Sequence, residues 1–337
     1  MNVIFMFMLI CLVVHCNTAM PRGTCDFSNN VVQNCEAVIE SPLDLISTEL
    51  QNVTLELSCS PGVHCIVISN VDHVDIYNTN ITCHEEAQGI GLGRGSLYLD
   101  KVNFDSCAGA ITFSSGSNLR ILNSNFENNI GRAINVYCAS SVSIKESSFI
   151  NNSNGAGVGN EGGGAVRIVN TTMIDITTSK FIRNTAHFSD DEVQGGACHI
   201  RNTFRLSISH STFANNTVLG YGKGAGVYIS NAFTLLTNVT FVGNSAATGY
   251  FSEGGGVALY DSNCEIVECS FRENKADKGG MLFANGVNSG IIKSSNAETN
   301  IADDVWCHNA DFLMDHSSIA NIPNIIQSLG CQVCLLS

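Results

Sequence analysis

A short pattern of apolar and polar positions recurs along this chain, and its spacing predicts the architecture. In segments such as SNFENN, SKFIRN and STFANN, a phenylalanine is followed three residues later by an asparagine, and the pattern returns every 23 to 32 residues. The fifth and seventh residues before the phenylalanine are mostly apolar, and the second is small. The six anchors are Phe126, Phe149, Phe181, Phe213, Phe241 and Phe271. A pattern that returns in this way is the signature of a solenoid.

The spacing within one repeat is that of a β-strand. Apolar residues two positions apart, separated by a polar residue, place alternate side chains on opposite faces. The shortest repeats leave no room for a crossover helix, so equivalent strands must stack in parallel. The sequence therefore predicts an all-β protein, a single-stranded right-handed parallel β-helix of about eleven rungs with disulfide-capped ends. Polar outward positions predict an outer face in contact with water.

Weaker copies of the pattern extend the predicted stack at both ends. Val53, Leu55, Ser58 and Ser60 fit a first rung, and Phe312, Met314, Ser317 and Ile319 fit a last one. The predicted anchors lie at positions 60, 81, 104, 126, 149, 181, 213, 241, 271, 297 and 319.

The asparagines that follow the anchors predict a ladder at one corner of the stack. Asparagine tolerates left-handed backbone geometry better than most residues, and stacked amides can hydrogen-bond along a column. The predicted members are Asn129, Asn152, Asn184, Asn216, Asn244, Asn274 and Asn300. Glycine-rich segments, among them GGGAV (162–166) and GGGVA (254–258), precede the next strand, where glycine permits a close approach of the backbone.

The alternation of F-x-x-N with GGA-type segments resembles the repeats of the chlamydial polymorphic outer-membrane proteins. More broadly, the chain is similar to the pectin-lyase-like family of right-handed β-helices, over roughly residues 50 to 320. The resemblance implies the fold but no particular activity, because that family includes lyases, hydrolases, adhesins and surface proteins. The NTD, GHG and RIK motifs of polygalacturonase-like enzymes do not occur in this sequence.

The N-terminus predicts secretion. Residues 3–14 are an apolar run of twelve, too short to span a membrane as an ordinary helix and typical of a signal peptide. We assign residues 1–19 to this signal, with cleavage after Cys16 or Ala19. The rest divides into an N-terminal cap (20–50), the β-helix (51–322) and a C-terminal cap or tail (323–337). We expect a secreted, extracellular protein with no membrane span in the mature chain.

Sequons and cysteines fit that route. The six Asn-x-Ser/Thr sequons predict glycosylation at Asn52, Asn80, Asn151, Asn170, Asn215 and Asn238, although a chain so rich in Asn and Ser would contain several by chance.

Fifteen cysteines predict disulfides. Cys83 and Cys107 lie one rung apart and are placed to bridge. Cys264 and Cys269 fall at inward positions, where we expect them to be buried. The remaining clusters lie in the caps: Cys25, Cys35, Cys59 and Cys65, and Cys307, Cys331 and Cys334.

Charge excludes one class of partner. The formal net charge is −14, so nucleic-acid phosphates would be repelled. Carbohydrate or protein, at the cell surface or in the matrix, is the expected partner.

The longer rungs between Phe149 and Phe271 predict a lobe. Their extra residues lie after the asparagine and before the glycines, so the loops should stack along one edge. The lobe carries five acidic residues, and oxygen-rich clusters of this kind suit calcium, the only cofactor that the sequence suggests. Simple solvation of the loops is the alternative interpretation. The five are Glu161, Asp190, Asp191, Glu192 and Glu253.

A row of side chains beside the lobe is the candidate ligand site. Arg167, His199 and Tyr228 take matching outward positions, with Arg201 nearby, and Tyr250 and Phe251 belong to the lobe. Such a row can hydrogen-bond to and stack on a sugar, and an ordinary wet strand face is the alternative. No catalytic residue is predicted, because Asp190 and Asp191 are adjacent, whereas a glycoside hydrolase needs two carboxylates facing each other across a cleft.

The resulting expectation is a secreted or cell-surface β-helix without enzymatic activity, acting in adhesion, matrix structure or recognition of glycans or proteins. The alternative is a polysaccharide lyase or glycoside hydrolase that uses the lobe of the central rungs. For a calcium-dependent lyase, Arg167 or Arg201 would be the base and Asp190 or Asp191 an acidic ligand of the metal.

Overall fold

A computed structural model describes residues 23–29, 31–45, 49–69, 72–84, 86–154, 162–246 and 251–336, with only the backbone for residues 23, 24 and 188–192. The predicted signal peptide, Glu161 and Tyr250 lie outside the described residues, as do the side chains of Asp190, Asp191 and Glu192.

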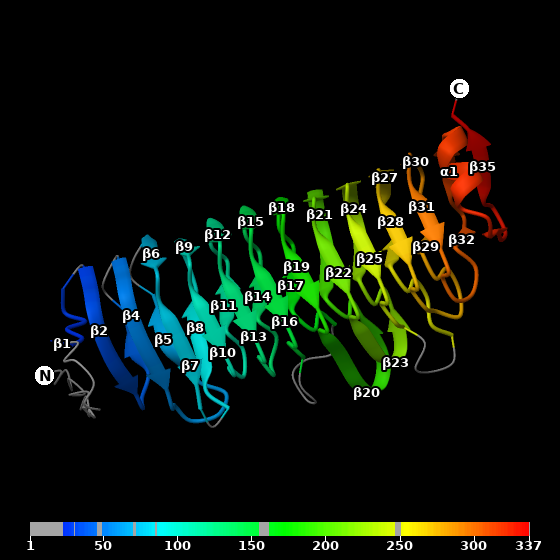
Figure 1. Ribbon diagram of the computed structural model, residues 1–337. Helices are drawn as coiled ribbons and strands as arrows, with labels where there is room; N and C mark the ends of the chain where they lie inside the picture. The colour runs from blue at the N-terminus through cyan, green and yellow to red at the C-terminus, as the bar shows by residue number, and fades with distance from the viewer. Residues whose placement is uncertain are drawn as a thin grey trace, which may run out of the picture.

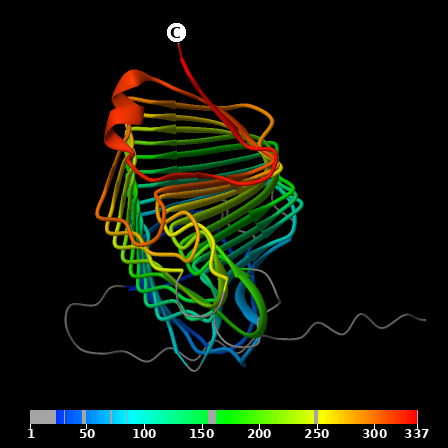
Figure 2. The ribbon, with the colours of Figure 1, turned by 90° about the vertical axis from the view of Figure 1, so that its right-hand side faces the viewer.

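The chain is an all-β parallel solenoid (Figure 1). A central rung contains three strands, and each strand pairs in parallel with its equivalents in the rungs before and after it. Viewed along the stack, the rungs superimpose around a common interior (Figure 2). The prediction of parallel, in-register stacking is therefore confirmed.

The strands form three faces. The glycine face, which follows the glycine-rich segments, contains β3 (Leu43–Asp44), β5 (His64–Ile68), β8 (Gln88–Leu92), β11 (Ile111–Ser114), β14 (Ile134–Tyr137), β17 (Val166–Val169), β26 (Val257–Tyr260), β29 (Leu282–Asn285), β32 (Val305–His308) and β34 (Ile325–Gln327). The aliphatic face contains β6 (His73–Tyr77), β9 (Ser96–Asp100), β12 (Asn118–Leu122), β15 (Ser141–Lys145), β18 (Met173–Thr177), β27 (Asn263–Val267), β30 (Gly290–Lys293), β33 (Asp311–Met314) and β35 (Gln332–Leu335). The phenylalanine face contains β7 (Asn80–Cys83), β10 (Asn103–Asp105), β13 (Asn125–Glu127), β16 (Ser148–Ile150), β19 (Lys180–Ile182), β22 (Thr212–Ala214), β25 (Thr240–Val242), β28 (Ser270–Arg272) and β31 (Asn296–Glu298).

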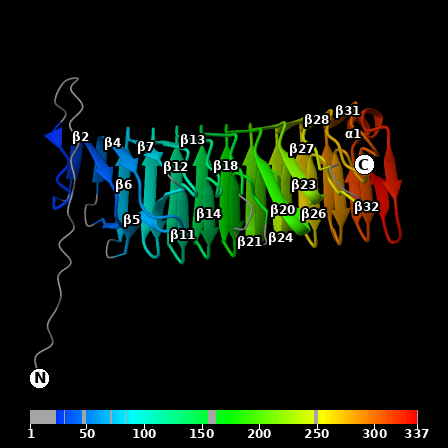
Figure 3. The same ribbon diagram turned by 90° about the horizontal axis from the view of Figure 1, so that it is seen from below.

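The remaining elements lie at corners and ends. Two long strands, β21 (Cys198–Ser209) and β24 (Val227–Thr237), run through the corner from the glycine face into the aliphatic face. At the N-terminus, β1 (Gly23–Thr24), β2 (Val31–Ile39) and β4 (Glu49–Leu57) begin the stack. A separate parallel pair, β20 (Thr185–Gln194) and β23 (Thr217–Lys223), forms the lobe, beside β21 and β24 (Figures 1 and 3). The helix α1 (His316–Asn321) lies near the C-terminal end.

The predicted phenylalanine column fills the interior. From Phe104 to Phe271, successive rings lie almost parallel, with centroids 4.7 to 5.1 Å apart. These rings are completely or almost completely buried. Parallel in-register pairing repeats each side chain above its equivalent, so the rung spacing of about 4.8 Å sets the ring spacing.

The first and last predicted rungs were wrong. Leu55 pairs with Ile81, so Leu55 and not Ser60 holds the anchor position. At the other end, Ile319 lies in α1 and is 41% exposed. Asp315 caps this helix, because its Oδ1 accepts a hydrogen bond from the Ser318 N–H at 2.8 Å. Parallel pairing also continues through β2 and β35, into both segments assigned to caps.

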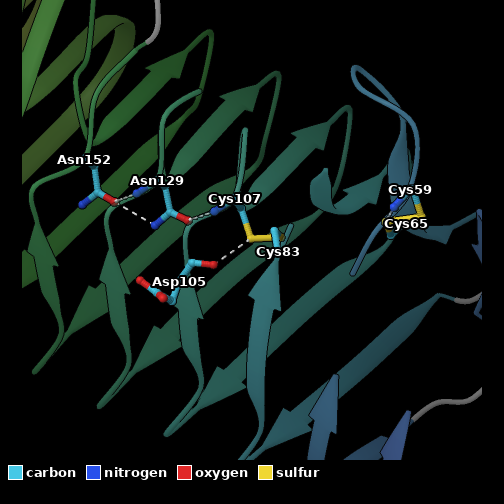
Figure 4. Close-up of a disulfide and its surroundings, with 7 residues drawn as sticks. All are labelled: Cys59, Cys65, Cys83, Asp105, Cys107, Asn129 and Asn152. Carbon is cyan, nitrogen blue, oxygen red and sulfur yellow. Dashed lines mark hydrogen bonds between the residues drawn. A yellow bond between two sulfur atoms is a disulfide. The ribbon is translucent and has the colours of Figure 1, made fainter. Parts of the chain in front are cut away.

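The seven predicted asparagines form one hydrogen-bonded column. From Asn129 to Asn300, each Nδ2 donates to Oδ1 of the next member at 2.7 to 3.1 Å. From Asn152 onward, Nδ2 also donates to the anchor carbonyl of the preceding rung, as Asn216 does to Phe181 at 2.9 Å. At the N-terminal end, Oδ1 of Asn129 accepts from the backbone of Cys107, beside the Cys83–Cys107 disulfide (Figure 4).

Of the two predicted reasons for this column, the hydrogen bonding of stacked amides is confirmed and the left-handed backbone was wrong. The ladder asparagines are not the left-handed residues, because that conformation belongs to the residue before each of them, as in Asn151 (φ 55°) and Asn215 (φ 54°). Two further columns of left-handed residues occupy the other corners, one through Asn170, Asn202 and Asn231 and one through His210 and Asn238. Left-handed residues therefore turn the chain at the corners, while the ladder satisfies buried backbone groups.

The disulfides confirm the predicted Cys83–Cys107 bridge. The end clusters contain Cys25–Cys35, Cys59–Cys65 and Cys307–Cys331. Cys264 and Cys269 are buried free thiols, as predicted, and burial raises the pKa of Cys264 to about 12 and that of Cys269 to about 11.

Candidate ligand-binding groove

The predicted row beside the lobe exists, but its centre is buried. Arg167 pairs with His199, and His199 with Tyr228, so the three side chains occupy equivalent outward positions. His199 has no exposed surface and Tyr228 is 7% exposed. The outer face is therefore not wet here, contrary to expectation, and neither ring is open to a ligand.

His199 is chemically unusual for a buried residue. Neither ring nitrogen has a hydrogen-bond partner among the described residues. Burial lowers the pKa of His199 well below its ordinary value, and the positive charges of Arg167, Arg132 and Arg201 lower it further. The imidazole is therefore neutral, and it forms a T-shaped contact with the ring of Tyr228, with centroids 5.2 Å apart.

An aromatic series continues this row toward the C-terminus. Tyr228, Tyr260, Phe283 and Trp306 follow one another with centroids 4.9 to 5.5 Å apart. Lys223 lies over Tyr260, with Nζ 4.7 Å from the ring centroid, a distance typical of a cation–π contact. Lys278 lies over Trp306 in the same way, at 4.6 Å.

Glu253 joins these lysines. Its carboxylate is 3.5 Å from Lys223 Nζ and 3.9 Å from Lys278 Nζ, and it accepts a hydrogen bond from the Tyr260 hydroxyl. Of the five predicted calcium ligands, only Glu253 has a described side chain, and two ammonium groups already neutralise it. The described residues contain no group of three His, Cys, Asp or Glu side chains that could hold a metal ion.

Two other predicted ligand residues are exposed. Phe251, in the lobe, is 72% exposed, and Arg201 lies at the surface where β21 leaves the glycine face. Neither belongs to the aromatic series, so the predicted ligand residues do not form one accessible surface.

A groove lies instead at the corner between the glycine and aliphatic faces. It has a volume of about 460 Å³. Residues from four successive rungs line it: Asn202, Thr203, Phe204, Asn231, Ala232, Phe233, Asp261, Asn263 and Asn288.

Backbone irregularity exposes the aromatic residues of this groove. Thr203 pairs with Ala232, whereas Arg205 pairs with Phe233, so Phe204 is an extra residue in β21. A β-bulge of this kind redirects a side chain. Phe204 is 79% exposed and Phe233 is 52% exposed.

Hydrogen bonds hold the amides of the groove in place. Nδ2 of Asn231 donates to Oδ1 of Asn202 at 3.1 Å, and Nδ2 of Asn202 donates to Oδ1 of Asn170 at 2.9 Å. Asn202, Asn231 and Asp261 all have left-handed backbones (φ 54°, 52° and 46°) and occupy equivalent corners. Asn263 is fixed by the backbone N–H of Ser289, which donates to its Oδ1 at 3.1 Å. The polar groups of the groove are therefore arranged before a ligand binds.

The groove was not predicted from the sequence, although a signal was present. The segments NTF (202–204) and NAF (231–233) follow the glycine face in two successive rungs. The repetition of these segments indicates a corner at which Asn and Phe recur in successive rungs. The bulge that exposes Phe204 cannot be predicted in this way, because it depends on how β21 and β24 pair.

The six sequons lie on turns or strand surfaces. Asn52, Asn151, Asn215 and Asn238 are exposed left-handed residues, and Asn80 is exposed on β7. Asn170, also left-handed, is half-buried and joins the amide column that leads into the groove.

No protein-family model matches this chain, and no curated protein or solved structure matches it either. In the part of the chain that the structure describes, no helix has the length and apolar character needed to cross a membrane.

Proposed function

We propose that this chain is a secreted recognition protein that binds glycans without chemically altering them. It is a right-handed parallel β-helix of about eleven rungs, similar to pectin-lyase-like proteins in fold. The observation that carries the proposal is the corner groove, in which two exposed phenylalanines, Phe204 and Phe233, stand among hydrogen-bonding amides. Binding sites commonly combine aromatic surface with a few fixed polar groups that orient the ligand.

Two further observations support an extracellular setting. The part of the chain that the structure describes contains four disulfides, and such bonds persist in oxidising compartments. The asparagines of five of the six sequons are exposed, as glycosylation requires.

The proposal is tested by binding to an array of glycans and by substitution of the aromatic residues. The native protein should retain a defined set of glycans, and Phe204→Ala with Phe233→Ala should abolish that binding while leaving the thermal midpoint unchanged. Phe251→Ala is the matched control, because it removes from the lobe a phenylalanine whose exposure lies between those of Phe204 and Phe233. Retention of the same glycans by the double variant would refute the groove as the binding site.

A second candidate is enzymatic and uses the lobe. It is favoured by the contact of the Tyr260 hydroxyl with Glu253 between two lysines, since such groups can transfer protons. Incubation with acidic and neutral polysaccharides, with and without calcium, separates the two functions. Enzymatic activity would be established if the native protein releases products from a polysaccharide and the variant Tyr260→Phe, Arg167→Ala or Asp190→Ala does not.

A further inference from the structure

The geometry of the corner groove points to one class of glycan: we infer that it binds an uncharged polysaccharide, laid parallel to the solenoid axis with one sugar ring per rung. This inference rests on the proposed function and makes it more specific. It depends on three properties of the groove, namely its charge, its hydrogen-bonding groups and its repeat distance.

The charge of the groove disfavours acidic glycans. Asp261 is the only charged residue among the nine that line it. Arg201 and Arg205 adjoin the lining residues in sequence but are not among them. With a net charge of −14 on the whole chain, a uronate or sulfated polymer would meet repulsion and no lining cation.

The hydrogen-bonding groups match sugar hydroxyls. Four of the lining residues are asparagines. An amide side chain both donates and accepts hydrogen bonds, as a hydroxyl does, whereas a lysine only donates and a carboxylate only accepts. Phe204 and Phe233 add flat apolar surfaces on which the C–H face of a ring can pack. This combination suits a ligand that is apolar on its faces and hydroxylated at its edges.

The repeat distance selects a polysaccharide over a peptide. Equivalent groups in successive rungs recur at the strand spacing of about 4.8 Å, while an extended peptide advances only about 3.3 Å per residue. The length that each ring adds to a linear, equatorially linked sugar polymer is close to the rung spacing. A sugar chain along the axis therefore places one ring beside each of Asn202, Asn231 and Asp261 in turn, because these residues occupy equivalent corners, and alternate rings of a β-1,4-linked chain present opposite edges to them. A peptide would lose register after one rung.

The number of rungs sets the length of the site. The lining residues come from four successive rungs, around positions 202–204, 231–233, 261–263 and 288. Affinity should therefore increase with each added sugar up to about four rings, and then remain constant.

Calorimetric titration of the full chain tests this inference. The probes are neutral oligosaccharides of two to six rings (β-1,4-glucose, β-1,4-mannose and β-1,4-N-acetylglucosamine series), hexagalacturonate, and an uncharged six-residue peptide. We expect at least one neutral series to bind and to reach constant affinity near four rings, and the acidic hexamer and the peptide to bind at least tenfold more weakly. Phe204→Ala and Phe233→Ala should each weaken binding at least tenfold, and Phe251→Ala less than twofold.

The variant Asp261→Asn provides a further test of the role of charge. It removes the lining charge while keeping a side chain that tolerates the left-handed corner. Hexagalacturonate should then bind at least threefold more tightly relative to the neutral series, and an unchanged ratio of the two affinities would overturn the role assigned to the charge of the groove.

The possible failures are distinguishable. Tighter binding of the acidic hexamer than of every neutral series, or affinity that rises without a plateau to six rings, overturns the inference but leaves glycan recognition intact. Tighter binding of the peptide, lost in Phe204→Ala, would identify a protein partner and overturn both. Binding of glycans that neither Phe204→Ala nor Phe233→Ala affects would overturn the groove itself.

Discussion

At the scale of single residues, neighbouring asparagines have opposite roles. Asn215 is exposed and left-handed and turns the chain, whereas Asn216 is fully buried and belongs to the ladder. Oδ1 of Asn216 accepts from both N–H and Nδ2 of Asn184, and its own Nδ2 donates to Asn244 and Phe181. The side chain is therefore a junction between rungs, and removing it leaves several buried groups without partners.

We predict that Asn216→Ala lowers the free energy of unfolding by about 3 kcal/mol, since each buried group left unpaired costs roughly 1–3 kcal/mol. Urea denaturation of unglycosylated protein measures the change. Asn215→Gly is the control, because glycine also accepts the left-handed corner, and it should change stability by less than about 0.5 kcal/mol. Equal effects of the two substitutions would contradict the division of roles.

His199 predicts a dependence of stability on pH. In the unfolded chain it takes up a proton near pH 6.5, whereas burial keeps it neutral in the folded protein. The unfolded state then binds more protons, so stability should fall as the pH drops below about 6.5, by up to about 1.4 kcal/mol per pH unit. Above pH 7 this group should contribute no slope.

Denaturation midpoints of the native chain and of His199→Gln, measured between pH 7.5 and 5, test this dependence. The variant should lose stability less steeply on acidification, and the slope that remains includes His64, whose pKa burial also lowers. Parallel slopes in the two proteins would show that His199 becomes protonated in the folded state.

At the scale of elements, the lobe is a small sheet with its own core. Alanines and valines of β20, β23 and the adjoining loops form an apolar cluster separate from the main one: Ala186, Val193, Val218, Ala225, Ala246 and Ala276. Parallel β-bridges join Lys223 to Glu253 and Glu253 to Lys278, so the three residues occupy equivalent positions in successive rungs. Both lysines lie over rings of the aromatic series. Charge and cation–π contacts therefore contribute to the attachment of the lobe to the glycine face.

We predict that Glu253→Ala loosens this attachment, because it leaves two lysines and the Tyr260 hydroxyl without their shared partner. The side chains of Lys223 and Glu253 are each only 15% exposed, so the loss should be about 1 kcal/mol, near the upper end for surface pairs. Trypsin should also cleave faster after Lys223 and Lys278. Glu273→Ala, which breaks the exposed pair with Arg272, should change neither quantity. Unchanged cleavage in Glu253→Ala would mean that the apolar cluster alone holds the lobe.

At the scale of the whole molecule, the two halves of the stack are stabilised differently. The central rungs contain stacked phenylalanines, and the described residues there contain no disulfide. The N-terminal rungs have smaller anchors, such as Leu55 and Ile81, and three of the four disulfides found among the described residues. Because a solenoid rung contacts only its neighbours, each end should unfold with its own stability.

We predict that Cys83→Ser with Cys107→Ser destabilises the N-terminal rungs by about 3 kcal/mol, the value expected for a closed loop of this length. Hydrogen exchange followed by mass spectrometry should show faster exchange in β4 to β11 and unchanged exchange in β19 to β28. Cys334→Ser, which removes an exposed free thiol, is the control and should leave both regions unchanged. Faster exchange along the entire stack would show that the solenoid unfolds as one cooperative unit.

The spacing of residues in the sequence was sufficient for features that repeat from rung to rung. In-register parallel pairing places every residue beside its equivalent in the next rung. The spacing therefore predicts the phenylalanine column, the positions of the ladder asparagines, the Cys83–Cys107 bridge and the alignment of Arg167 with His199. The end rungs failed for a physical reason. The alternation at Val53 and Leu55 fits two registers equally well, and near Ser318 the chain forms a capped helix where the template expects a strand.

The candidate site depended on what lies outside the repeat. Sequence alone placed His199 in an outward row but could not show that it is buried, because burial depends on how the neighbouring segments pack against that row. The groove likewise required the tertiary structure, because a one-residue bulge between Thr203 and Arg205 sends Phe204 into solvent. The repeat thus determined which residues stack on one another, whereas side-chain exposure was decided only by three-dimensional packing, since it depends on contacts between segments that share no common spacing.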